Sequence, residues 1–161
     1  VALALMLIYI WIRFEWQFSL GAILALFHDV IVTLGLFSLL GLEINLSIIA
    51  AVLTIVGYSM NDTVVIFDRV RENLKKYSDL KIFDLTNISI NETLSRTLIT
   101  SITTLLALLS IFFFGGEILK GFSLAMIFGV IFGTYSSIYI SNTVLVRLKV
   151  SQKTILKDES N

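Results

Sequence analysis

The sequence contains no cysteine, which excludes a disulfide framework, catalysis by a thiol and any metal site built on cysteine. Charged residues are also scarce: they make up 15% of the chain, where a soluble domain averages about 25%. The formal net charge is zero, so bulk electrostatics give no reason to expect a nucleic-acid partner. The zinc-protease motif H-E-x-x-H, the hydrolase motif G-x-S-x-G and a phosphate-binding loop are all missing. No cofactor or metal is therefore expected.

Hydrophobic residues are abundant instead. They make up 57% of the chain, and the mean hydropathy is +0.91, whereas soluble domains average about 45–50% apolar residues. The apolar residues also lie in runs too long for a soluble core of this size. The composition predicts an all-α, polytopic transmembrane helix bundle.

Five hydrophobic segments are predicted, and the first is short. Residues 1–12 are apolar throughout, but at about 1.5 Å per residue they cover roughly 18 Å of a hydrocarbon core about 30 Å thick. We expect them to be the second half of a helix that begins upstream, so that the sequence is a piece of a longer chain. The transmembrane domain is predicted over 1–150 and a tail over 151–161, with spans at 1–12, 21–42, 46–67, 97–114 and 122–146.

The distribution of basic residues predicts the orientation in the membrane. Eleven of the twelve Lys and Arg residues fall on one side of the predicted spans, and Lys120 falls on the other. Because cytoplasmic loops carry an excess of Lys and Arg, that side is expected to be the cytoplasm. The C-terminus and the connection 68–95 would then be cytoplasmic.

The predicted connections carry local signals of their own. A short polar turn is expected around Arg13 and Glu15. The connection 68–95 is expected to extend the third span as a helix with an Asp68–Arg71 pair at i,i+3. Near its end, the S-x-x-E sequence 89–92 matches a capping box and predicts that the fourth helix starts there.

Asp62 and its neighbour Asn61 lie within the cytoplasmic half of the third span. A carboxylate there costs about 2.5–3.5 kcal/mol on insertion scales and should face other helices or water. Asp29, preceded by His28, lies at a similar depth in the second span, and Arg96 begins the fourth. One interpretation is a proton pathway made of Asp62, Arg96, Asp29 and His28. The other is that these groups only hydrogen-bond helices together, with Arg96 extending to the interface.

Three threonines follow Arg96 at helical spacing, and they favour the first interpretation. Thr100, Thr103 and Thr104 form one polar stripe along an otherwise apolar helix, which a lipid-facing surface would not need. They are predicted, with Asn61, to support the proton pathway.

The fifth span carries small residues at every fourth position. This spacing lets helix backbones approach closely and predicts a packing face, within the bundle or against another subunit. Leucine at Gly129 or Gly133 should disrupt it, whereas Val130 and Ile131 should be less sensitive. The face consists of Gly121, Ala125, Gly129, Gly133, Ser137 and Ser141.

An enzyme is a weaker alternative. Two intramembrane aspartates suggest an aspartyl protease, but that class needs a GxGD-type motif at its second aspartate, and GYSMND at 57–62 is not one. We therefore do not expect an enzyme.

Several stretches are similar to one family of membrane proteins. The segment GYSMNDTVVIFDRVREN, at 57–73, resembles the SecF signature of the SecD/SecF family, within the RND superfamily. SecD proteins carry an Asp-Ala-Asn element where this chain has Asn-Asp-Thr at 61–63. Asn142 is a departure, because many relatives have proline there. Further similar stretches are ALFHDV at 25–30, TSITTLLALLSIFFFGG at 100–116 and FGTYSSIYIS at 132–141.

The resemblance implies an auxiliary subunit of the Sec protein translocase in the bacterial inner membrane. It implies SecD, the SecYEG translocon and exported polypeptides as partners, with YajC as a further candidate, and work driven by the proton gradient. Asp62 and Arg96 match the intramembrane acid and base of the family; Asp29 is a less direct match. The alternatives are an RND-type exporter of lipids or drugs and a translocon scaffold that uses no energy.

Overall fold

The computed structural model describes residues 1–153 and residue 155. Within these residues the chain forms five α-helices and no strand: α1 (Ala2–Arg13), α2 (Trp16–Leu39), α3 (Leu46–Lys76), α4 (Ile82–Phe114) and α5 (Glu117–Arg147). Helices α2, α3, α4 and α5 are long and apolar enough to cross a membrane. The predicted all-α, polytopic transmembrane bundle is confirmed.

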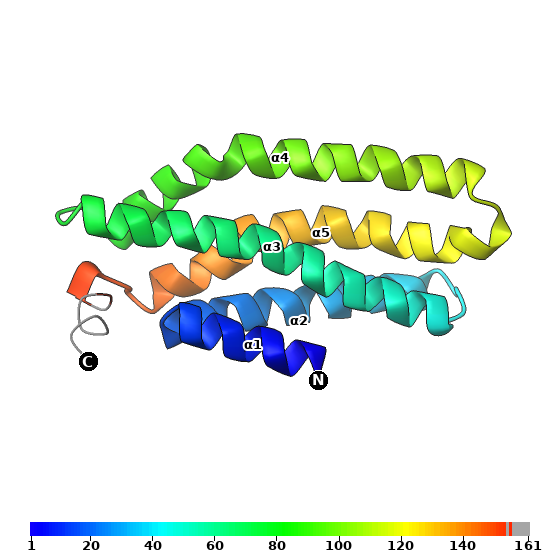
Figure 1. The fold of residues 1–161 in the computed structure, drawn as a ribbon, viewed down its shortest axis with the longest axis horizontal. Helices are drawn as coiled ribbons and strands as arrows, with labels where there is room; N and C mark the ends of the chain where they lie inside the picture. The colour runs from blue at the N-terminus through cyan, green and yellow to red at the C-terminus, as the bar shows by residue number, and fades with distance from the viewer. Residues whose placement is uncertain (154, 156–161) are drawn as a thin grey trace.

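Helix α5 lies at the centre of the bundle. Helices α2, α3 and α4 each pack along it, and the short α1 packs against α2 (Figure 1). A central helix that touches three neighbours must allow close approach on several sides, so its own side chains must be small where the neighbours cross.

The small residues of α5 meet this requirement. A Cβ atom at Gly129 would lie 2.2 Å from the Ile55 side chain of α3, and one at Gly133 would lie 3.3 Å from the Ser59 Cβ. Ala125, Ser137 and Ser141 of the same stripe are fully buried, and a Cβ at Gly121 would meet the Ile48 side chain at 3.4 Å. The stripe therefore faces the inside of this chain's own bundle, and most of its residues pack against α3.

Helix α2 approaches α5 through a glycine of its own. A Cβ atom at Gly21 would lie 2.8 Å from the backbone carbonyl oxygen of Ser141. Two apolar clusters flank these contacts. One centres on Phe18, Phe67 and Leu85 and the other on Phe37 and Ile55.

The two ends of the bundle carry different connections between the helices. The α2–α3 and α4–α5 turns, at residues 40–45 and 115–116, lie together at one end (Figure 1). Gly41 and Gly116 have φ values of 64° and 77°, which suit glycine. The opposite end carries the α3–α4 hairpin and the C-terminal end of α5, and both helices of the hairpin extend beyond their predicted spans.

The polar turn around Arg13 and Glu15 is present but shorter than expected, and the predicted Asp68–Arg71 pair is wrong. The polar turn near Arg13 shrinks to residues 14–15, because α2 already begins at Trp16. This tight turn brings Arg13 and Glu15 against α3, where Arg13 pairs with Asp68 and Glu15 with Arg71, each at 3.3 Å. The two α3 side chains therefore bind α1–α2 partners rather than each other, and the predicted Asp68–Arg71 pair does not form.

The predicted capping box is also wrong. Helix α4 begins at Ile82 with Lys81 as its N-cap, two turns before Ser89. The Ser89 hydroxyl donates to the Leu85 carbonyl oxygen at 2.8 Å, as expected of a residue inside a helix. Leu85 is fully buried in the larger apolar cluster, and this burial explains the early start.

The predicted tail 151–161 lies largely outside the described residues, since residues 154 and 156–161 are not described. Val150 and Ile155 are buried and join the same apolar cluster as Leu85.

Candidate functional site

Asp62 occupies the inner face of α3 and is 4% exposed. Its Oδ2 atom has no hydrogen-bond partner among the described residues. The charge acting on it is Arg96 of α4, which interacts with the carboxylate electrostatically. A buried carboxylate without a full set of hydrogen bonds is costly in its charged form, so the site favours any event that neutralises Asp62.

Arg96 lies in a charged cleft between α3 and α4. The cleft is lined by Arg96 together with Asp68, Arg69, Glu72 and Glu92, and with Val65 and Thr93. Arg96 itself is exposed. Asp62 does not line this cleft, so the charge of Arg96 acts on the carboxylate from outside the buried site.

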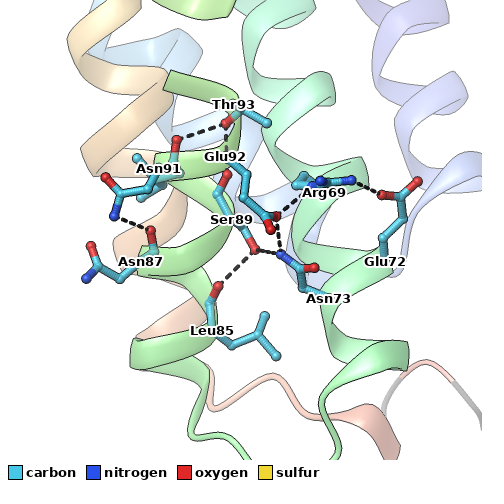
Figure 2. A network of polar contacts seen from close by, with 10 residues as sticks. Arg69, Glu72, Asn73, Leu85, Asn87, Ser89, Asn91, Glu92 and Thr93 are labelled. Atoms are coloured by element: carbon cyan, nitrogen blue, oxygen red, sulfur yellow. Dashed lines mark hydrogen bonds and ion pairs between the residues drawn. The ribbon is translucent and has the colours of Figure 1, made fainter. Parts of the chain in front are cut away.

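A hydrogen-bonded network next to this cleft connects the two helices of the α3–α4 hairpin (Figure 2). Arg69 donates to Glu92 at 2.7 Å and to Glu72 at 2.8 Å. Asn73 donates to Ser89 and to Glu92, both at 2.9 Å. Glu92 of α4 therefore accepts from two side chains of α3, and this contact ties the two helices together.

The network gives a pH-dependent prediction. Hydrogen bonds from Asn73 and from Arg69 lower the pKa of Glu92 below its ordinary value of 4.5. A lowered carboxylate pKa stabilises the folded form above the ordinary value, and that contribution is lost as the pH falls through the lowered pKa. Hydrogen-exchange protection of residues 82–90, corrected for the intrinsic rate, should therefore fall below about pH 4.5.

The matched variant is Glu92→Gln, which keeps the side-chain size but does not ionise. Its protection should lack the acid-dependent component of the wild-type protein. Identical pH profiles for the two proteins would show that Glu92 does not hold the hairpin.

A second polar cluster surrounds Asp29, which is fully buried on α2. The Ser59 hydroxyl of α3 donates to Asp29 Oδ2 at 2.5 Å, and His28 Nδ1 lies 3.1 Å from Oδ1. The His28 side chain is 30% exposed. Unlike Asp62, this carboxylate is held by hydrogen bonds on both oxygens.

Hydroxyl groups extend from Asp29 toward the Asp62 turn of α3. Thr63 Oγ1 lies 3.0 Å from Ser137 Oγ, and Ser137 Oγ lies 3.5 Å from Ser59 Oγ. All three hydroxyls are buried, and Thr63 is the residue after Asp62. Asp29, Ser59, Thr63 and Ser137 therefore form one polar cluster that crosses α2, α3 and α5, and Asp62 lies beside it on α3 without a hydrogen bond to it among the described residues.

The other predicted polar residues lie differently. Asn61 is exposed, because one residue along a helix turns the side chain about 100° away from Asp62. Thr100, Thr103 and Thr104 donate to carbonyl oxygens of their own helix at 2.7, 2.8 and 2.8 Å. None of these four hydrogen-bonds to Asp62 or Asp29 in the described part of the chain.

Several polar residues of the core were not predicted from the sequence. Ser101 is buried on α4 and lies 2.7 Å from Thr134 and 3.4 Å from the Tyr58 hydroxyl. Ser59 lies within the GYSMND stretch, but its residue type offered no reason to single it out beside Asp62. The available signal was helical spacing, since Ser59 precedes Asp62 by three residues and so shares its face.

Four membrane-length helices around a buried, charged core define a multi-pass helical membrane protein. The family model for the C-terminal part of the SecD/SecF protein export membrane proteins matches residues 1–151. The chain therefore belongs to the SecD/SecF family.

Relatives named protein translocase subunit SecF are similar along most of the chain. The relative from Cereibacter sphaeroides is 52% identical over 151 residues, which cover 94% of this chain and 47% of the relative. The relative from Rickettsia conorii is 58% identical over 152 residues, covering 92% and 49%. The chain thus spans about half the length of the curated relatives it matches.

Solved structures agree with the fold. A crystal structure of SecDF from Thermus thermophilus, titled a translocon-associated membrane protein, superposes with a TM-score of 0.88 at 51% identity. That match covers 91% of this chain and 20% of the other. A SecDF structure in a super-membrane-facing form gives a TM-score of 0.87 at 48% identity, covering 98% and 21%.

Proposed function

We propose that this chain is part of a SecF-type subunit of the Sec protein translocase, which works with SecD and uses the proton gradient to promote export of polypeptides. The names of the similar proteins support the translocase role and the association with SecD. The observation that carries the proton coupling is the buried Asp62 carboxylate, with one oxygen unpartnered among the described residues and Arg96 opposite it on another helix.

The mechanism follows from the charge of this pair. When Asp62 is ionised, its attraction to Arg96 holds α3 and α4 together around the cleft. A proton arriving from the outer side neutralises the carboxylate and removes that attraction, so the two helices can move apart. Release of the proton to the cytoplasmic side restores the pair. One elementary charge crossing 100 mV supplies about 2.3 kcal/mol, which is enough to shift a nearly balanced two-state equilibrium substantially.

The core around Asp29 has a different role in this proposal. Its carboxylate is hydrogen-bonded on both oxygens, so it positions α2 against α3 and α5 while Asp62 changes charge. His28 lies beside it, and its side chain is partly exposed at the surface of the bundle.

The experiment that tests the proposal is polypeptide export into membrane vesicles that contain the full-length protein, SecD and the SecYEG translocon. A SecF-type subunit should increase export when a proton gradient is imposed and lose this effect when an uncoupler removes the gradient. An equal stimulation with and without the gradient would favour a scaffold.

The proposal places the chain in the bacterial inner membrane with the α3–α4 hairpin and the C-terminus in the cytoplasm. The chain has no cysteine, so single cysteines can be introduced at Lys76, Lys120 and Lys153, all of which are exposed. In intact cells an impermeant thiol reagent should label the cysteine at Lys120 and leave the other two unlabelled. Labelling at Lys76 would reverse the orientation.

A further inference from the structure

Three carboxylates and two guanidinium groups line the cleft between α3 and α4. The acids are Asp68, Glu72 and Glu92, and the bases are Arg69 and Arg96. Each acid has a basic partner, and within residues 1–153 and 155 that partner is never Arg96. Because the acids outnumber the bases, the way in which they pair decides which base keeps its charge for a group outside the cleft.

One arginine binds two of these acids. Arg69 donates from Nε to Glu92 at 2.7 Å and from Nη1 to Glu72 at 2.8 Å, and Figure 2 shows it between the two carboxylates. The third acid, Asp68, pairs with Arg13 of α1 at 3.3 Å. A guanidinium carries five N–H donors in a fixed plane, so a single arginine can hold two carboxylates at once.

Arg96 is left without an ion pair in the described part of the chain. Its charge acts on the buried Asp62 carboxylate. The charges that act on Glu92 are those of Arg69 and Lys76, although Arg96 is on the same helix as Glu92. The pairing in the cleft thus leaves the charge of Arg96 for Asp62.

Glu92 is the acid best placed to compete for Arg96. It precedes Arg96 by four residues on α4, and an acid at position i forms a favourable pair with a base at i+4 on a helix surface. The Glu92 side chain is 31% exposed, whereas that of Glu72 is 67% exposed, so water screens Glu72 more strongly. A Glu92–Arg96 pair would weaken the attraction between Arg96 and Asp62.

We propose that Arg69 is a positioning residue for the Asp62–Arg96 pair. By binding Glu92 and Glu72, it keeps their carboxylates away from Arg96 and leaves the Arg96 charge for Asp62. Arg69 acts through Arg96, since it has no hydrogen bond to Asp62 in the described part of the chain. This role rests on the proposed function, in which a proton switches the Asp62–Arg96 attraction.

The first test is gradient-dependent export in vesicles that contain the full-length protein, SecD and the SecYEG translocon. Arg69→Gln should reduce the stimulation by the gradient several-fold, because the released Glu92 carboxylate pairs with Arg96. Adding Glu92→Gln to Arg69→Gln should restore most of the stimulation, since no competing carboxylate then lies one turn from Arg96. Glu92→Gln alone should also retain most of it.

The single variants separate this role from a purely structural one. Arg69→Gln and Glu92→Gln break the same α3–α4 ion pair from its two ends. If Arg69 only tied the helices together, the two variants would lose equal stimulation and the double variant would not recover. Either result would overturn the proposal. Arg69→Lys keeps the charge but loses the planar fork, so its stimulation should lie between that of the wild type and that of Arg69→Gln.

The second test reports on Arg96 without a proton gradient. The purified full-length complex is treated with phenylglyoxal, which modifies the unprotonated guanidine of arginine, and the rate at Arg96 is followed by mass spectrometry. A carboxylate partner keeps a guanidinium protonated. Labelling of Arg96 should therefore be several-fold slower in Arg69→Gln than in the wild type, and the double variant should recover the wild-type rate.

The two tests distinguish a failure of this proposal from a failure of the proposed function. Unchanged labelling of Arg96 in Arg69→Gln would overturn the positioning role, whatever the export assay gives. If labelling changes as expected but the wild-type protein shows no stimulation by the gradient, the proposed function fails, and the role of Arg69 in proton coupling fails with it.

Discussion

Replacing Asp62 with asparagine is expected to abolish the stimulation of export by the proton gradient, while the protein still folds, inserts and binds its partners. Asparagine keeps the size of the side chain and its hydrogen-bonding capacity, but it does not ionise. Asp62 is 4% exposed and one of its oxygens has no partner among the described residues, so folding does not depend on its charge. The measurement is gradient-dependent export in vesicles of a SecD-containing complex that carries the full-length protein.

The matched control for this change is Asp84→Asn in the first turn of α4. The Asp84 side chain is exposed and does not line the cleft at Arg96. This variant should keep wild-type stimulation. Arg96→Lys, which keeps the charge but loses the planar guanidinium, should be partly active. Wild-type stimulation by Asp62→Asn would mean that the carboxylate is structural, as the scaffold alternative requires.

Replacing Gly129 with leucine is expected to prevent correct assembly of the bundle. Even a Cβ atom at this position would lie 2.2 Å from the Ile55 side chain, and the backbone of the central helix cannot withdraw without disturbing three neighbours. Overpacking of a well-packed core typically costs about 1–3 kcal/mol and occasionally more, and here a whole branched side chain must be accommodated. We expect a large loss of monodisperse full-length protein in size-exclusion chromatography and a lower unfolding temperature for the remainder.

Gly35→Leu is the matched control, because a Cβ atom at Gly35 meets nothing within 4 Å. It should behave like the wild type. Val130 does not serve as a less sensitive position, contrary to the expectation from sequence, because it is fully buried on another side of α5. Ile131, which is 47% exposed, is suitable. Equal damage by leucine at Gly35 and Gly129 would show that the small-residue stripe is not the packing face.

The apolar runs in the sequence were sufficient to predict the helix bundle but not to predict where the helices begin and end. Long apolar runs require helices in a membrane, since the backbone must satisfy its own hydrogen bonds there. The start of α4 at Ile82 depends instead on burial of Leu85 against other helices, which a local pattern such as the capping box does not contain. The ion pairs Arg13–Asp68 and Arg71–Glu15 could not be predicted either, because each joins residues that are far apart in the sequence.

The inward-facing positions of the site's carboxylates could be predicted from the cost of exposing a charge to lipid. An ionised residue within a span must face the interior, and Asp29 and Asp62 both do so. Their partners were less predictable, because they depend on which turns of two helices meet. Ser59 and Ser137 are hydroxyl residues that any helix tolerates, and only the crossing of α3 and α5 brings them together beside Asp29.

The central claim is that Asp62 takes up and releases a proton within the membrane. The most direct measurement is proton flux across proteoliposomes that contain the full-length protein with SecD, under an imposed gradient and membrane potential. The account predicts that the wild type dissipates the gradient faster than protein-free liposomes. Asp62→Asn should fall to the protein-free rate, while Asp84→Asn should match the wild type. A wild-type rate in the Asp62→Asn variant would contradict the account.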